Sequence, residues 1–312
     1  MSRVLISDAM DIIAENLLKE NKIEVDVKVN LNQQELIKII SVYDGLIVRS
    51  ATKVTKEILD SADNLKIIGR AGAGVDNIDL QAATDKKIVV MNTPGGNTNA
   101  TAEHTLALLF SLIRKIPESN YGTHKGLWEK KKLKGNELRG KNIGIIGFGN
   151  VGKRFSEMCY GLGLNILIHS KHFHNIKDEY PNYQSVDLEF LIKKSDIISL
   201  HCKATVNNSP IIVMQHLSQM KKNCLIINTA RGNLVDETDL KKALEQGIIK
   251  GAALDVFKSE PATDNDLFGL KNLLLTPHIA ASTSEAQIIV AEMIAKQFCD
   301  YFTKNKINNS VN

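Results

Sequence analysis

Three residues with complementary chemistry follow three predicted strands in the second half of the sequence: Arg231, Glu260 and His278. A guanidinium can clamp a carboxylate in a fork and polarise a neighbouring carbonyl oxygen. An imidazole can accept or return a hydroxyl proton, and a carboxylate beside it fixes its tautomer and favours its protonated form. Each residue alone is more often structural, as an ion pair, a loop carboxylate or a satisfied polar side chain. Their order at successive strand ends favours one site for proton transfer beside a bound carboxylate.

A glycine-rich segment precedes these residues and has the spacing of a dinucleotide-binding turn. It consists of Gly147, Phe148, Gly149, Asn150, Val151 and Gly152. Gly147 permits a tight turn, Gly149 lets backbone amides approach a pyrophosphate, and Gly152 lets helix and strand pack closely. The pattern alone is weak, because glycines at this spacing also occur in structural turns. A predicted strand before it and a helical pattern at 153–161 after it favour cofactor binding.

The second strand of a dinucleotide fold usually ends in an acid that binds the adenosine ribose. Here Ser170 and Lys171 follow that strand. A carboxylate would repel a 2′-phosphate, whereas Ser170 and Lys171 can receive one. Two interpretations stay open: a site that accepts or prefers NADP, and a relaxed NAD site in which other groups hold the ribose.

The elements that must position these residues alternate between short apolar runs and longer amphipathic ones, which is typical of parallel α/β sheets. The first series of predicted strands is Val4–Ser7, Val25–Val29, Gly45–Val48, Lys66–Gly69 and Ile88–Met91. The second is Asn142–Ile146, Asn165–Ile168, Ile197–Leu200, Cys224–Asn228, Gly251–Leu254 and Leu273–Leu275. Six strands with intervening helices match a doubly wound dinucleotide fold. Helices are predicted at Gln33–Ser41, at Thr55–Ser61 with Thr55 as its cap, at 101–115 and at 284–303.

The length of 312 residues suits two domains. The pattern breaks at 92–97, where two glycines beside a proline make a plausible hinge. We expect a discontinuous substrate domain, 1–97 plus 285–312, and a dinucleotide-binding domain, 98–284, because the apolar stripe of the last helix needs a surface to cover. The basic stretch 125–134 is either a solvated loop or an arm that contacts a second subunit, and it carries the only tryptophan, Trp128.

Composition sets few further limits. The net charge of +4 is small and suits an anionic small molecule as well as a nucleic acid. The four cysteines, without a C-x-x-C pair, favour buried reduced thiols over metal ligands. The N-terminus reads as a strand rather than a signal peptide, and the longest apolar stretch, near 106–113, is too short to cross a bilayer. We expect a cytoplasmic protein without metal, membrane or nucleic-acid partners.

At these residues the sequence resembles the D-isomer-specific 2-hydroxyacid dehydrogenase family, over nearly the whole chain. The three signature-like segments are 147–152, 228–232 and 276–279. Within the family the similarity is to phosphoglycerate dehydrogenases, in the segments 48–55, 69–77, 92–98, 254–257 and 277–287. The resemblance implies a Rossmann domain with a flavodoxin-like substrate domain, and a homodimer to which the Trp128 region contributes. Since the chain stops at Asn312, C-terminal regulatory domains and serine feedback through them are not expected.

The resemblance also implies roles for individual residues. Arg231 would bind the substrate carboxylate, His278 would transfer the proton, Glu260 would support His278, and Asp255 would hold the nicotinamide carboxamide. Further implied cofactor contacts are His201, Cys202, Thr229, Ala230, His278 and Ala280. Implied substrate contacts are Arg49, Ser50, Arg70, Gly72, Ala73, Gly74 and Asn97, with Arg70 adding positive charge for a phosphate. Two departures from the family pattern are Ser170, in place of the acid, and Lys203, where relatives usually carry proline.

The leading hypothesis is NAD-dependent oxidation of 3-phospho-D-glycerate to 3-phosphohydroxypyruvate, the entry step of serine biosynthesis, with NADP possible because of Ser170. The substrate would be a small anionic 2-hydroxy or 2-oxo acid. The enzymatic alternative is a glyoxylate or hydroxypyruvate reductase on the same scaffold. A hypothesis from another class is a dinucleotide-sensing, corepressor-like scaffold that binds peptides, disfavoured by the lack of disordered flanking tails.

Overall fold

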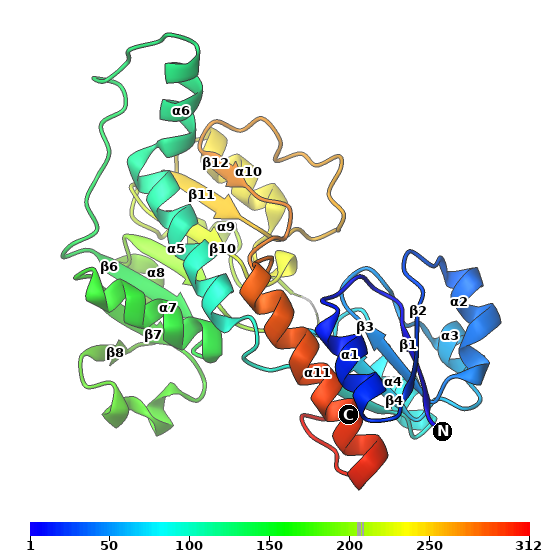
Figure 1. Cartoon of the computed structure of the whole chain (residues 1–312). Coiled ribbons are helices and arrows are strands. Elements are labelled where there is room, and N and C mark those ends of the chain that lie inside the picture. Colours follow the sequence, from blue (N-terminus) through cyan, green and yellow to red (C-terminus); the bar gives the residue numbers. More distant parts are fainter. Residues whose placement is uncertain (205–206, 208) are drawn as a thin grey trace. The chain divides into compact units, whose positions relative to one another are not determined.

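The computed structural model describes residues 1–204, 207 and 209–312 (Figure 1). The chain forms two compact units, Met1–Asn97 with Ser282–Asn312, and Thr98–Ala281. Each unit contains one sheet whose paired strands all run parallel. The predicted fold class, two doubly wound α/β sheets, is confirmed.

The sheet of the first unit has the order β2-β1-β3-β4-β5, which is the flavodoxin-like order. Its strands are β1 (Arg3–Ile6), β2 (Glu24–Val27), β3 (Gly45–Val48), β4 (Ile67–Arg70) and β5 (Val89–Asn92). Its helices are α1 (Ile13–Glu20), α2 (Gln33–Ile39), α3 (Lys56–Asp60), α4 (Leu80–Asp85) and α11 (Ser284–Lys304), with a 3₁₀ turn η1 (Ile40–Val42). Thr55 is the residue before α3, but its side chain makes no capping hydrogen bond, so that predicted cap is wrong.

Alternate residues of these strands face two helical layers, as the pleat requires. One face packs against α2, α3 and α4, and the other against α1 and α11. On α11 the apolar stripe lies on the sheet, where Phe298 occupies the space above Gly45 and Gly69. A Cβ on Gly45 would lie 2.8 Å from the Phe298 ring, and one on Gly69 2.4 Å from it. Two strand glycines therefore make room for an aromatic residue more than 200 positions away.

Within the described residues, the sheet of the second unit has seven strands in the order β12-β11-β10-β9-β6-β7-β8. They are β6 (Asn142–Ile146), β7 (Asn165–His169), β8 (Tyr183–Ser185), β9 (Ile197–Leu200), β10 (Leu225–Asn228), β11 (Gly251–Leu254) and β12 (Leu273–Leu275). This is the Rossmann order with one strand added after the sixth. The prediction of six strands missed β8, because that edge strand is only three residues long and lacks an apolar run.

Among the described residues, the second unit also contains several helices, most of which cover a face of this sheet. They are α5 (Thr98–Arg114), α6 (Ile116–His124), α7 (Asn150–Gly161), α8 (Leu188–Lys194), α9 (Met214–Leu217) and α10 (Glu237–Glu245), with 3₁₀ turns η2 (Phe173–Asn175), η3 (Lys177–Glu179) and η4 (Gly232–Leu234). Apolar residues of α5 and α7 pack on one face, and those of α8, α9 and α10 on the other. The order reverses between β6 and β9, where ligands of such sheets bind.

In Figure 1, α6 and the segment after it extend beyond the rest of the second unit. We call residues 115–136 the arm. Its base is closed by two hydrogen bonds, from the amide of Asn136 to the carbonyl of Ile113 and from Lys115 Nζ to the carbonyl of Lys132. In the part of the chain that the structure describes, no helix combines the length and apolar character needed to cross a membrane.

Candidate active site

Strand register brings the three catalytic candidates to one edge of the second sheet. β10 ends at Asn228, which pairs with Leu254 at the end of β11, and Leu254 pairs with Leu275 at the end of β12. The loops that begin at residues 229, 255 and 276 therefore leave the sheet side by side. These loops carry Arg231, Glu260 and His278.

His278 and Glu260 form a hydrogen-bonded pair. Nδ1 of His278 lies 2.6 Å from Oε2 of Glu260, and the other carboxylate oxygen accepts from the amide of Phe257 at 2.9 Å. The hydrogen bond that His278 donates to Glu260 raises the pKa of His278 and outweighs the loss of hydration, which lowers it. Partial burial tends to raise the pKa of Glu260, but the bonds from His278 and Phe257 together hold it below its ordinary value. Each partner therefore stabilises the charged form of the other.

The Arg231 loop lies directly against the loop that carries Glu260. A Cβ on Gly232 would lie 1.9 Å from the carbonyl carbon of Phe257, so only glycine allows this approach. The side-chain amide of Asn228 donates to the carbonyl of Arg231 at 2.8 Å, and Asn228 Oδ1 accepts from the amide of Ala230 at 3.1 Å. Asn228 thus shapes the turn that presents the Arg231 guanidinium, whose Nη1 donates to the carbonyl of Ala230 at 2.7 Å.

Asp255 is fully buried and organises the turn that holds His278. Its Oδ1 accepts from Thr276 Oγ1 at 2.6 Å and from the amide of Ile279 at 2.9 Å, and its Oδ2 accepts from the amide of Ala280 at 2.8 Å. Burial acts to raise the pKa of Asp255, but these bonds, with one from His104, lower it overall. The carboxylate is therefore ionised in a site that would otherwise favour the neutral acid.

The glycine segment has the geometry that a bound dinucleotide needs. Gly147 has φ +95°, and a Cβ there would lie 2.6 Å from the amide of Cys202. A Cβ on Gly152 would lie 2.3 Å from the Gly147 carbonyl oxygen, whereas one on Gly149, just before α7, would meet no protein atom within 4 Å. Gly147 and Gly152 therefore close the turn, and Gly149 leaves open space at the N-terminus of a 12-residue helix. These residues fit the pyrophosphate of NAD.

The remaining cofactor candidates lie beside this turn or after other strands of the same sheet. The amide of Gly147 donates to the carbonyl of His169 at 2.9 Å, which places Ser170 and exposed Lys171 beside the glycine loop. His201 and Cys202 follow β9, across the turn, and burial lowers the pKa of His201 to about 3, so its ring is neutral. Phe148 packs edge-on against Phe173, Tyr180 and Tyr183, so these aromatic rings help to hold the glycine loop in place.

The other candidates lie in three places: Asn150 and Val151 at the start of α7, Thr229 and Ala230 after β10, and Ala280 in the 276–280 turn. Lys203 is exposed.

The predicted substrate contacts of the first unit also follow strand ends, those of β3, β4 and β5. Arg49 and Ser50 begin the loop after β3, where the Arg49 amide donates to buried Asp8 at 2.6 Å and its guanidinium to the carbonyl of Ala9 at 2.9 Å. Arg70 is the last residue of β4, and its guanidinium lies over Gly72. A Cβ on Gly72 would lie 1.3 Å from Nη1 of Arg70. Gly74 is partly buried, and Ala73 accepts from the Asn92 side chain at 2.6 Å. Asn97 is the last residue of this part of the unit.

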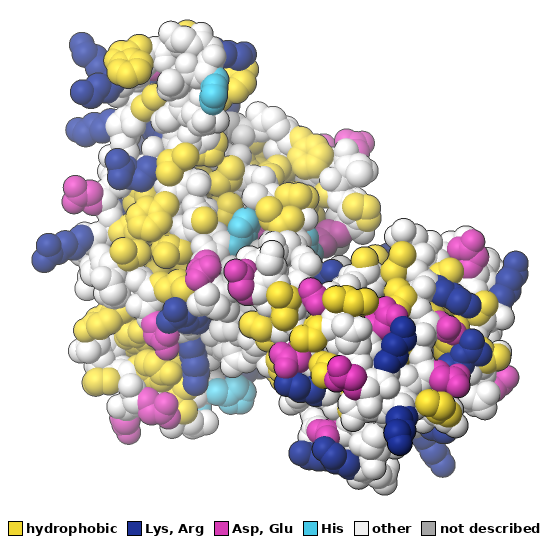
Figure 2. Space-filling model, in the orientation of Figure 1, with side chains coloured by type: hydrophobic (Ala, Val, Ile, Leu, Met, Phe, Trp, Pro, Cys, Tyr) yellow, Lys and Arg dark blue, Asp and Glu magenta, His cyan; other side chains and the backbone are white. Residues whose placement is uncertain are grey.

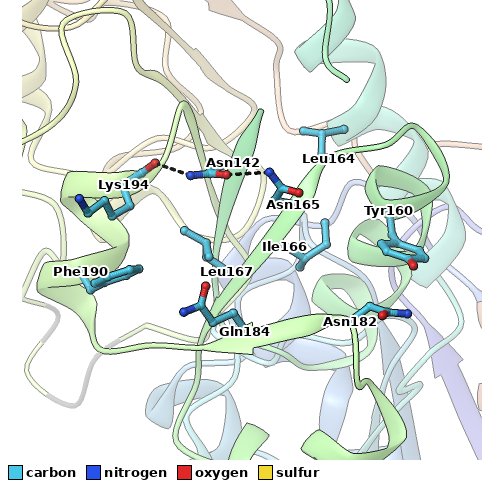
Figure 3. Close-up of a pocket in the computed structure, with 10 residues that line it drawn as sticks. All are labelled: Asn142, Tyr160, Leu164, Asn165, Ile166, Leu167, Asn182, Gln184, Phe190 and Lys194. Carbon is cyan, nitrogen blue, oxygen red and sulfur yellow. Dashed lines mark hydrogen bonds between the residues drawn. The ribbon is translucent and has the colours of Figure 1, made fainter. Parts of the chain in front are cut away.

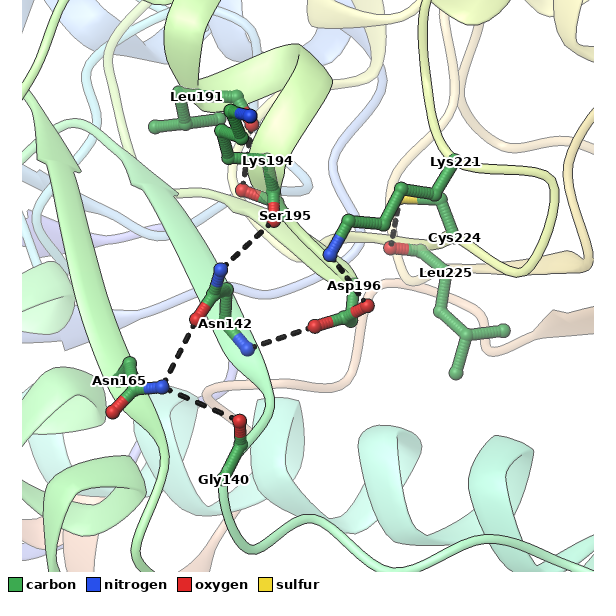
Figure 4. Close-up of polar contacts among 10 residues, drawn as sticks. All are labelled: Gly140, Asn142, Asn165, Leu191, Lys194, Ser195, Asp196, Lys221, Cys224 and Leu225. Atoms are coloured by element: carbon green, nitrogen blue, oxygen red, sulfur yellow. Dashed lines mark hydrogen bonds and ion pairs between the residues drawn. The ribbon is translucent and has the colours of Figure 1, made fainter.

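A pocket at the opposite edge of the second sheet is not part of this site. Figure 3 shows it between β7, β8 and α8, lined by Asn142, Tyr160, Leu164, Asn165, Ile166, Leu167, Asn182, Gln184, Phe190 and Lys194. Asn142 and Asn165 are the first residues of β6 and β7, whereas the catalytic candidates lie in loops that follow the last residues of β10, β11 and β12. In Figure 4 the same edge is closed by Asp196, which accepts from the Asn142 amide at 2.9 Å and from Lys221 at 2.8 Å. These contacts are structural.

Sequence reasoning missed His104, Thr276, Thr105 and Gly232. His104 Nε2 lies 3.1 Å from Thr276 Oγ1, and the buried hydroxyl of Thr105 lies 2.8 Å from that of Thr229. Both contacts join α5 to strand ends more than 120 positions away. The available signal was a His-Thr pair directly before the apolar run of this helix, but it does not indicate the partners.

Clusters of metal-binding side chains and pairs of cysteines are two further kinds of site that the described residues could form. Across the described ranges, no three His, Cys, Asp or Glu side chains are grouped as a metal ion would require. All four cysteines are free thiols; Cys159, Cys224 and Cys299 are buried, and Cys202 is only partly so. Burial raises the pKa of Cys202 to about 11, which leaves its thiol protonated and unreactive.

The family model of the D-isomer specific 2-hydroxyacid dehydrogenase NAD binding domain matches residues 106–280. The chain belongs to this family. The resemblance found in the motifs is therefore confirmed, and the chain contains the family's NAD-binding domain. The matched range includes the glycine loop and the loops that carry Arg231, Glu260 and His278.

Two curated relatives and one solved structure are similar over nearly the whole chain. D-3-phosphoglycerate dehydrogenase of Archaeoglobus fulgidus is 42% identical over 99% of this chain and 59% of the relative. Hydroxypyruvate reductase of Thermotoga maritima is 43% identical over 95% of this chain and 97% of the relative. The NAD⁺-bound 3-phosphoglycerate dehydrogenase structure of Entamoeba histolytica has a TM-score of 0.85 and 30% identity, covering 100% of this chain and 98% of that one. The chain spans less than two thirds of the length of the curated phosphoglycerate dehydrogenases it matches.

Proposed function

We propose that the protein is an NAD-dependent dehydrogenase that oxidises 3-phospho-D-glycerate to 3-phosphohydroxypyruvate. The observation that carries this proposal is the hydrogen-bonded pair of His278 and Glu260 beside the Arg231 loop, at the sheet edge that also holds the glycine turn. The relatives named D-3-phosphoglycerate dehydrogenase, at about 40% identity, support the choice of substrate.

Each of the three residues then has a role set by its contacts. NAD, held at the glycine loop by Gly147, Gly149 and Gly152, would supply the hydride acceptor for C2 of the hydroxy acid, and NADH the hydride donor in the reverse direction. Since Glu260 holds Nδ1 of His278, the proton of the substrate hydroxyl passes to Nε2. Arg231 binds the substrate carboxylate in a fork and polarises the oxygen on C2. The family resemblance assigns the nicotinamide carboxamide to Asp255, whose carboxylate also holds the 276–280 turn.

The residues of the first unit are proposed to bind the rest of the substrate. Their placement after strand ends suits ligand binding, and the arginines Arg49 and Arg70 suit an anion. Arg70 would bind the phosphate, and Arg49, Ser50, Gly72, Ala73, Gly74 and Asn97 would contact the acid. A hydroxypyruvate reductase is the second candidate function, which the similarity to the Thermotoga maritima relative over nearly its whole length favours.

Steady-state assays with three oxo acids separate these functions. We expect kcat/KM for NADH-dependent reduction of 3-phosphohydroxypyruvate to exceed that for hydroxypyruvate and glyoxylate. Arg70→Gln should lower this value for the phosphorylated acid more than for the other two. Equal kcat/KM for 3-phosphohydroxypyruvate and hydroxypyruvate would contradict the phosphorylated substrate and favour the reductase. Absence of turnover with all three acids, with retained NADH binding, would contradict both proposed functions.

The protein is also proposed to be a cytoplasmic homodimer. The four free thiols suit a reducing compartment. The arm exposes large apolar side chains, with Tyr121 62% and Trp128 85% accessible. In Figure 2, apolar and basic side chains gather over the region where Figure 1 places α6. An apolar surface on a projecting segment suits burial against a second copy of the chain.

A further inference from the structure

Helix α5 reaches two of the strand ends that carry the proposed catalytic residues. Its adjacent residues His104 and Thr105 contact different loops: His104 contacts Thr276 after β12, and Thr105 contacts Thr229 after β10. The helix itself is fixed to the sheet by buried Leu108, Leu109 and Ile113. It can therefore act as a rigid support for both loops.

The hydrogen-bond directions around His104 follow from the number of protons available. Thr276 has one hydroxyl proton and donates it to Asp255, whose carboxylate can only accept. Thr276 Oγ1 must therefore accept from His104, so Nε2 of His104 carries a proton. The same Nε2 lies 3.4 Å from Oδ1 of Asp255. The three residues therefore form a chain of hydrogen bonds in which His104 donates to Thr276 and Thr276 donates to Asp255.

This chain ends on the turn that holds His278. Asp255 accepts from the amides of Ile279 and Ala280, and the amide of His278 donates to the carbonyl of Thr276 at 3.0 Å. His278 itself has φ +53°, a left-handed conformation that a non-glycine residue keeps only where its surroundings impose it. The bonds of Asp255 and Thr276 supply that constraint.

We propose that His104 is a positioning residue of the site: by donating Nε2–H to Thr276 it orients the Thr276 hydroxyl toward Asp255 and holds the 276–280 turn in the conformation that presents His278. The catalytic half of this inference rests on the proposed function, whereas its structural half does not. Without the donor, Thr276 Oγ1 has other orientations, and the turn loses its link to α5. His278 then samples positions from which Nε2 does not meet the substrate hydroxyl.

The test compares three variants. His104→Leu removes the donor, His104→Gln keeps an N–H that can reach Thr276, and Glu103→Gln changes an exposed neighbour on the same helix as a control. In His104→Leu we expect kcat to fall by about 10²-fold, as for a misplaced catalytic group, with little change in KM. His104→Gln should recover most of that loss, and Glu103→Gln should match the wild type.

Amide hydrogen exchange of the 276–281 segment gives a readout that does not depend on activity. Ile279 and Ala280 should exchange faster in His104→Leu than in the wild type, and near the wild-type rate in His104→Gln. Unchanged exchange in His104→Leu, or faster exchange with unchanged kcat, would overturn the inference. If His104→Gln is as impaired as His104→Leu, the role is packing and the inference is also wrong. A wild type without turnover refutes the proposed function alone, because the exchange experiment still tests the turn.

Discussion

Nδ1 of His278 lies 2.6 Å from Oε2 of Glu260, although the two residues are 18 positions apart and leave the sheet from different strands. The contact forms because β11 and β12 end in register and because the loop after β11 folds back so that Phe257 donates to Glu260. The side chains are 45% and 33% accessible, so the pair adds little to stability and is positioned to act on a ligand.

Replacing Glu260 by Gln should move the pH profile of the reaction. Glu260 raises the pKa of His278, so the variant should return it toward about 6.5. Oxidation needs neutral His278, and its rising limb should therefore shift to lower pH. Reduction needs protonated His278, so its activity should be lost at lower pH than in the wild type. Profiles of kcat/KM against pH in both directions test this. Identical profiles in the variant and the wild type would show that Glu260 does not affect the pKa of His278.

Replacing His278 should remove proton transfer without removing the cofactor. We expect kcat to fall by about 10²–10⁴-fold in His278→Ala, the usual contribution of a general acid–base group. Because this position is left-handed, His278→Asn is the better backbone match, since Asn tolerates that conformation. NADH fluorescence titration should give a Kd close to that of the wild type in both variants. Undiminished turnover would exclude His278 from the mechanism.

Two glycine-to-alanine changes in the same loop should affect different properties, stability in one variant and NADH affinity in the other. Gly152→Ala places a Cβ against the Gly147 carbonyl, so it should lower stability by about 1–3 kcal/mol, measured as a lower Tm. Gly149→Ala meets no protein atom and should cost less than about 1 kcal/mol as a helix-cap change. Its Cβ instead occupies space expected for the pyrophosphate, so Kd for NADH should rise at least about tenfold, or 1.4 kcal/mol. Unaltered NADH affinity in Gly149→Ala would place the pyrophosphate elsewhere.

Ser170→Asp should change the choice of cofactor. The new carboxylate lies beside the glycine loop, where it can accept from ribose hydroxyls and repels a 2′-phosphate. We expect the ratio of kcat/KM with NAD to that with NADP to increase. Lys171→Ala should act in the same direction by removing a positive charge. A ratio that is unchanged in both variants would show that the ribose is not bound at this strand end.

Trp128→Glu should dissociate the proposed dimer. Burying a carboxylate against an apolar surface is unfavourable, so sedimentation velocity should show a shift from dimer to monomer. The control is Val42→Glu, since Val42 is an exposed apolar residue of the first unit, 52% accessible. A wild-type chain that sediments as a monomer would refute the dimer, and a dimer retained in Trp128→Glu would exclude the arm from the interface.

Local patterns in the sequence were sufficient for much of the fold. The strands of both sheets, except β8, follow from apolar runs, and the glycine loop is recognisable from its spacing between a strand and a helix. The chemistry of Arg231, Glu260 and His278 was recognisable by residue type and by position after strands.

The tertiary structure alone decided which of these residues touch. The order β12-β11-β10-β9-β6-β7-β8 brings Gly232 against Phe257, and hydrophobic periodicity carries no information on strand order or register. The sequence did not indicate the partners of His104, because Thr276 and Asp255 are more than 150 positions away. Side-chain type and strand period are local properties, whereas the hydrogen bonds that hold the 276–280 turn depend on where α5 packs across the sheet.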